Sequence, residues 1–168
     1  MRNRTAKSAV LLPLFLSLLL IPFAGAAEKD EPEQRPAKRL VVIANRATPL
    51  NKVSTSQLQE LLLGTVSKWP NGREVSVIFV ANHSMVRALK QVLKMSKDDY
   101  ANHFLKSQYQ NVELNKPKTV PNLDSALQFL TSTPGSVAIL EADPDMTVGG
   151  VKTVRVDGKL PEEEGYRY

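Results

Sequence analysis

A run of polar residues stands where an apolar segment gives way to a predicted helix, and these residues are the best candidates for chemistry in this chain. Asn82, His83 and Ser84 directly follow the segment EVSVIFVA. Asn and Ser commonly begin helices, because their side-chain oxygens accept hydrogen bonds from the first free backbone N–H groups. Those N–H groups and the positive end of the helix dipole also favour an anion. The run is therefore either a helix cap alone or a cap that also contacts a ligand.

Familiar catalytic and metal-binding motifs are missing from the sequence. It has no Gly-x-Ser-x-Gly nucleophile elbow, no phosphate-cradling glycine loop and no His-Glu-x-x-His helix. His83 and His103 are the only histidines, and there is no cysteine, so a metal site is not expected. We expect neither an enzyme nor a cofactor.

A stripe of basic residues follows the polar run at helical spacing. It consists of Arg87, Lys90 and Lys94, with Lys97 nearby. Such a stripe is usually a solvated helix face, and its alternative role is to attract anions or acidic partners.

Alternating strands and helices must position these residues. Apolar and alternating patterns predict strands at 40–45, 74–82, 136–140 and 151–158. Helices are predicted after the caps Ser54, Ser96 and Asn122. Another is predicted from Ser84, with Val86, Leu89 and Leu93 turned inward. This order predicts an α/β fold, with a central mixed or parallel sheet flanked by helices.

The best-marked element is the leucine-rich helix after Ser54. Ser54 and Gln57 have the spacing of a capping box, and Gly64 supplies a left-handed stop. The only tryptophan, Trp69, follows this helix in the turn WPNG. We expect it to be a structural residue that folds back over the helix end, although tryptophan is also enriched at contact hot spots.

The chain is expected to divide into four parts. Residues 1–26 have the basic start, short apolar run and Ala-Gly-Ala ending of a cleaved signal peptide; the alternative is a retained membrane anchor. Residues 27–38 are charged and proline-containing and predict a flexible lead-in. The domain is expected over 39–158 and a loose tail over 159–168. Export implies a periplasmic or secreted protein with no stable membrane insertion.

The charge balance does not support a nucleic-acid partner. Three of the 22 basic residues lie in the leader, whereas all 17 acidic residues follow it. Cleavage would therefore lower the formal net charge from +5 to +2. The mature chain has no strong basic excess to attract nucleic acid.

Three stretches occur together in one order: LLLGTVSKWPNG, then VSVIFVANHSMVRALKQVL, then TPGSVAIL. In this arrangement the chain resembles the bacterial periplasmic phosphate-binding proteins of ABC transporters, and more closely their short one-lobe, PBP-like relatives. The resemblance extends over about residues 40–140. It implies a single lobe of the type II periplasmic binding protein fold.

The resemblance also implies a ligand site. In that family a Ser-Gly-Thr loop at a helix start holds a tetrahedral oxyanion, and the matching positions here begin at Asn82, His83 and Ser84. These three residues are the implied contacts, and Arg87 would add positive charge. The family's glycine and threonine are replaced by Met85 and Val86.

Two functions follow as hypotheses. The first is a periplasmic binding module that recognises a small oxyanion such as phosphate, weakly or with help from an envelope protein or a second copy, because one lobe provides only half a cleft. The second is an accessory protein of an envelope complex that kept the fold and lost the ligand site. Function resides in the site and not in the scaffold, so the fold alone does not choose between them.

Overall fold

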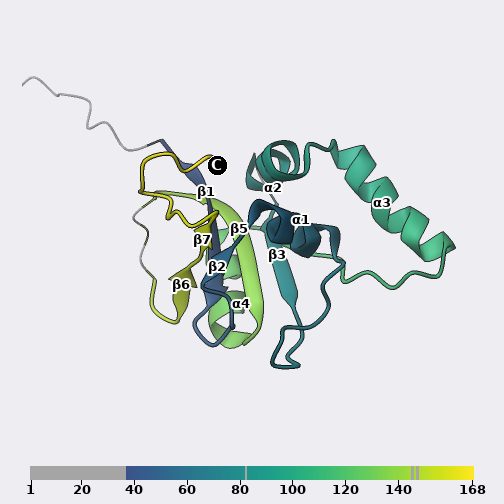
Figure 1. Cartoon of the computed structure of the whole chain (residues 1–168), viewed down its shortest axis with the longest axis horizontal. Coiled ribbons are helices and arrows are strands. Elements are labelled where there is room, and N and C mark those ends of the chain that lie inside the picture. Colours follow the sequence, from purple (N-terminus) through teal and green to yellow (C-terminus); the bar gives the residue numbers. More distant parts are fainter. Residues whose placement is uncertain (1–36, 82, 145, 147) are drawn as a thin grey trace, which may run out of the picture. The chain divides into compact units, whose positions relative to one another are not determined.

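A five-stranded mixed sheet forms the centre of the domain. The computed structural model describes residues 37–81, 83–144, 146 and 148–168; the expected signal peptide, most of the expected lead-in and Asn82 lie outside these residues. In sheet order the strands are β4 Lys118–Val120, β3 Ser76–Val80, β5 Ser136–Ala142, β1 Arg39–Asn45 and β6 Val151–Thr153 (Figure 1). A separate parallel pair joins β2 Lys52–Val53 to β7 Arg155–Val156.

The direction of the strands makes the sheet mixed. Strand β3 pairs in parallel with both β4 and β5, whereas β1 runs antiparallel to β5 and β6. The carboxyl ends of β3, β4 and β5 therefore meet at one edge of the sheet. Ligands of open α/β sheets bind at edges of this kind.

Helices cover both faces of the sheet. They are α1 Thr55–Leu63, α2 His83–Ala88, the π-helix η1 Leu89–Leu93, α3 Lys97–Tyr109 and α4 Leu123–Ser132. Along β1, Leu40 and Val42 face the core shared with α1, η1 and α3, whereas Val41 and Ile43 face the core shared with α4. Successive strand side chains point to opposite faces, so an unbroken apolar strand needs both layers.

The predicted helix boundaries are confirmed where capping residues marked them. Ser54 and Gln57 form the capping box of α1, and Gly64 ends the helix with a left-handed φ of 74°. Ser96 begins α3 by the same kind of reciprocal cap, and Asn122 caps α4. Local hydrogen bonds within a few residues fix these ends, which is why the sequence could mark them.

The helix predicted from Ser84 differs from expectation. It starts as α2, passes into the π-helix η1, and ends at Lys94 with a left-handed φ of 57°. Leu89 is buried as predicted, but the inward position predicted for Val86 is wrong, since this side chain is 42% exposed. The buried face of α2 passes through Ser84 and Ala88 instead.

Residues 159–168 also differ from the loose tail that composition predicted. The Tyr166 hydroxyl donates to the Leu40 carbonyl at 2.6 Å, and the Tyr168 hydroxyl lies within hydrogen-bond distance of Thr55 Oγ1. Both rings pack edge-to-face with each other and against the core shared with α1. The two tyrosines thus anchor this segment beside β1 and α1.

Two buried phenols should make stability depend on alkaline pH. Burial raises the pKa of Tyr100 and of Tyr166, whereas the unfolded chain releases these protons near pH 10. The stabilisation is therefore complete below about pH 10 and is lost as the pH rises above it, by at most about 1.4 kcal/mol per pH unit for each phenol.

Urea unfolding between neutral pH and pH 11 measures this effect. Tyr100→Phe and Tyr166→Phe should each make the alkaline decline less steep, although both lower stability at neutral pH. Tyr109→Phe is the matched control, because its side chain is 80% exposed. An alkaline slope that all three variants share would contradict the prediction.

Candidate functional site

The start of α2 lies at the edge where β3 and β5 end. Strand β3 finishes at Val80, and α2 begins at His83. The parallel neighbour β5 finishes at Ala142, which places Glu141 at the same edge. The structure thus brings Ser84, one residue of the predicted polar run, next to an acidic residue that sequence reasoning missed.

Ser84 is a buried tether between α2 and β5. Its side chain is 1% exposed, and its Oγ accepts a hydrogen bond of 2.9 Å from the backbone N–H of Glu141. A buried hydroxyl that satisfies a strand-end amide stabilises the fold, because an unpaired amide there would carry a desolvation penalty. The predicted hydroxyl donor therefore faces the protein interior.

Arg87 forms an ion pair at the same place. Its Nη1 lies 2.5 Å from Glu141 Oε1 and also donates to the Lys38 carbonyl at 2.9 Å. The two side chains are 32% and 21% exposed, so water screens the pair and its contribution to stability is modest, up to about 1 kcal/mol. The positive charge predicted for an incoming anion is neutralised by Glu141.

His83 is the most accessible of the described candidates. It is exposed at the first position of α2. Ser84 and Arg87 converge on Glu141, whereas Asn82 lies outside the described residues. Glu141 interrupts an otherwise apolar run at the end of β5, and this was the one sequence signal that could have pointed to it.

Trp69 is a structural residue, as predicted. Its side chain is 7% exposed, and its indole N–H donates to the Gly135 carbonyl at 2.8 Å. This bond ties the turn after α1 to the turn before β5. Buried indole groups normally need such a partner, because the ring is apolar and its N–H is not.

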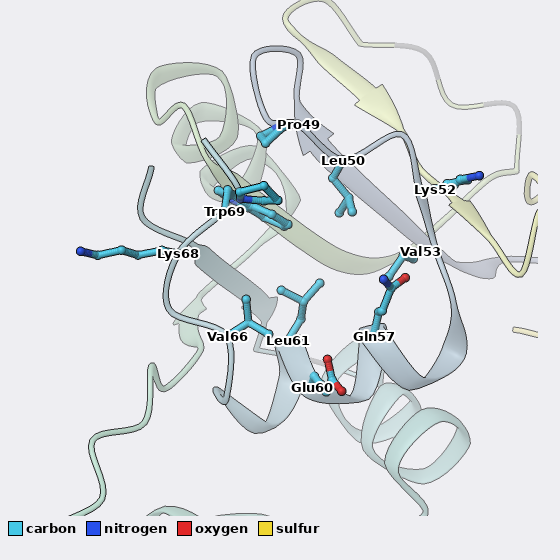
Figure 2. A pocket seen from close by; sticks show the side chains of 11 residues that line it. Pro49, Leu50, Lys52, Val53, Gln57, Glu60, Leu61, Val66, Lys68 and Trp69 are labelled. Carbon is cyan, nitrogen blue, oxygen red and sulfur yellow. The ribbon is translucent and has the colours of Figure 1, made fainter. Parts of the chain in front are cut away.

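A pocket of about 430 Å³ lies beside Trp69. Leu50, Leu61, Val66 and Trp69 point toward one another in Figure 2. The side chains of Lys52 and Lys68, also in the lining, point away from this centre in opposite directions (Figure 2). Gln57 and Glu60 also line the pocket, so it is of mixed character, and its two ammonium groups do not converge on a common point.

Among residues 37–81, 83–144, 146 and 148–168, no three His, Cys, Asp or Glu side chains gather into a potential metal site. No helix in these ranges is long and apolar enough to cross a bilayer.

Comparison with solved structures identifies the fold. The domain is similar to an ABC-type phosphate transport receptor from Vibrio cholerae, with a TM-score of 0.55 and 15% identity over 74% of this chain and 48% of that one. It is similar to PstS from Borrelia burgdorferi, with a TM-score of 0.55 and 13% identity over 74% and 49%. It is also similar to a phosphate-binding protein from Stenotrophomonas maltophilia, with a TM-score of 0.52 and 15% identity over 74% and 40%.

These proteins define the architecture of the chain as a PBP-like lobe. The predicted fold class, an α/β lobe with helices flanking a central mixed or parallel sheet, is confirmed, and the sheet is of the mixed kind. The matched region covers 48%, 49% and 40% of the lengths of these three structures, so the chain spans about half of each or less. Two of their names describe a phosphate transport receptor and a phosphate-binding protein. No family model matches the chain, and no curated protein matches its sequence.

Replacing Ser84 should lower stability more than replacing an exposed serine. Ser84→Ala leaves the Glu141 amide without its side-chain acceptor, which should cost about 1–3 kcal/mol of unfolding free energy. Ser56→Ala is the matched control, because Ser56 is exposed on α1, and its effect should stay within about 0.5 kcal/mol. Urea denaturation measures both variants, and equal effects would argue against the tether.

Proposed function

We propose that this chain is an accessory binding module of the bacterial envelope, acting in the periplasm through a protein partner and not by enclosing a small anion alone. One observation carries the proposal. Ser84 and Arg87, the two described residues best suited to hold an oxyanion, both engage Glu141. Their polar groups already have partners in the fold.

The charge at this edge supports the same conclusion. The carboxylate of Glu141 lies directly beside Arg87, so an arriving anion would meet a negative charge at close range. Like charges a few ångströms apart repel, and the repulsion is stronger where water is partly excluded. To bind there, an anion would have to displace Glu141 from Arg87.

The described lobe offers one side of a cleft. It matches about half the length of the structures that it resembles. A ligand on a single lobe stays largely in water, where each charged contact is weak. An envelope protein or a second copy of the chain would provide the missing cover.

A second candidate function is the weak or assisted recognition of a small oxyanion such as phosphate. It is favoured by the likeness to phosphate transport receptors and by His83, which is exposed at the start of α2 with no acidic residue in the first turn. In this alternative Asn82, His83, Ser84 and Arg87 are the contacts, and Arg87 exchanges Glu141 for the anion.

Anion-dependent stability distinguishes the two functions. A ligand that binds only the native state raises its melting temperature, and we expect phosphate and sulfate to raise it no more than chloride at equal ionic strength. Glu141→Gln removes the blocking charge and should make phosphate stabilise the protein. Glu162→Gln is the matched control, because Glu162 is exposed on the C-terminal segment.

The opposite outcome would support the oxyanion site. In that case phosphate would stabilise the unmodified protein more than chloride does, and His83→Ala or Ser84→Ala would remove the effect. Sedimentation of the purified chain tests for a second copy at the same time. A dimer that forms only with phosphate would place the anion between two lobes.

A further inference from the structure

A groove with an apolar floor and a basic rim lies between α2 and the start of α3. Its floor is formed by Val86, Leu89 and Met95, and its rim by Lys90, Lys94 and Lys97. We call it the lysine groove. Its volume is about 690 Å³, and it is separate from the edge at which Ser84 and Arg87 contact Glu141.

The local backbone creates the groove. Helix α2 passes into the π-helix η1, and the chain then turns at Lys94, whose φ of 57° is in the left-handed region. Ser96 caps α3 immediately afterwards. Val86 is 42% exposed on α2, and Met95 is partly exposed at the corner itself. A left-handed lysine costs free energy, and π-turns occur frequently at functional sites.

The rim is uniformly positive. All three lysines are exposed, and within the described residues none of them forms an ion pair. The acidic side chains that follow do not line the groove; Asp99 accepts hydrogen bonds from the Ser96 backbone and hydroxyl as part of the α3 cap. The lysine groove therefore has three charges available for an external partner.

The combination of floor and rim selects the kind of partner. A free phosphate ion would use the lysines and leave the apolar floor empty. A flat membrane surface could contact Val86 but would not reach Leu89, which is only 1% exposed at the base of the hollow. A partner with an apolar side chain between carboxylates would use both the apolar floor and the lysines of the rim. Charge complementarity would steer and align such a contact.

We propose that the lysine groove docks a protein segment that presents a large apolar side chain flanked by Asp or Glu, in the manner of an acidic amphipathic peptide. The inference rests on the proposed function, because it names the chemistry of the partner. The proposed function and this docking site can fail separately. Stabilisation by phosphate would overturn the proposed function, whereas the peptide experiment below tests only the lysine groove.

A displayed library of short random peptides tests the proposal without knowledge of the partner. The folded domain serves as bait, and the variant carrying Lys90→Glu, Lys94→Glu and Lys97→Glu serves for counter-selection. Peptides that survive should share Leu, Ile, Phe or Met between acidic residues. The most enriched peptide is then synthesised with a fluorescent label and titrated by anisotropy.

The variants separate the rim from the floor. The triple charge reversal should weaken binding of the labelled peptide by about tenfold or more, and Val86→Asn should weaken it by about threefold or more. Lys52→Glu and Lys106→Glu are matched controls on exposed lysines elsewhere, and each should change affinity by less than about twofold. Circular dichroism confirms that each variant is folded.

Three results would overturn the proposal. One is a library in which no peptide prefers the unmodified domain over the triple variant. Another is a preferred peptide without acidic residues, or one whose affinity does not change with Val86→Asn. The third concerns vesicles of anionic phospholipid. If the unmodified domain binds them, the triple variant does not, and the selected peptide fails to compete with them, the groove would be assigned to a membrane surface.

Discussion

The architecture depends on three central strands that are apolar on both faces. In β1, β3 and β5, successive side chains enter two different cores, so neither face can be left in water. Burying apolar surface is the main favourable contribution to folding, and a strand of this kind requires a helical layer on each side. The positions of α4 on one face and of α1, η1 and α3 on the other follow from this requirement.

Covering both faces leaves the strand ends as the places where polar groups can gather. At the end of β5, Glu141 offers its amide to Ser84 and its carboxylate to Arg87. In a two-lobed receptor such an edge can face a cleft. Here the same edge is held together by contacts within one lobe, because Ser84 and Arg87 both engage Glu141.

The corner after η1 lies at the lysine groove. The π-helix and the left-handed Lys94 interrupt the regular helix that the apolar spacing predicted, and Met95 and Lys97, which follow this corner, line the same groove as Val86. Val86 itself lies in the regular part of the helix, where the buried face passes through Ser84 and Ala88. The change of helix type thus contributes to a candidate contact surface.

The sequence by itself determined the features that depend on neighbouring residues. Caps at Ser54, Ser96 and Asn122, the glycine stop at Gly64 and the apolar strands were all predicted correctly, because they depend on hydrogen bonds or alternation within a few positions. The α/β class followed from their order, whereas the sequence left open whether the sheet is mixed or parallel. Trp69 was also predicted correctly, since its setting after the leucine helix favoured a structural role.

Only the tertiary structure decided the features that join distant parts of the chain. The contact of Ser84 with Glu141 spans 57 positions and that of Tyr166 with Leu40 spans 126, so no local pattern could reveal either of them. The antiparallel direction of β1, the packing of residues 159–168 and the exposure of Val86 have the same origin. Each depends on which surfaces of distant segments pack together after folding. A pattern within a few neighbouring residues does not specify that packing.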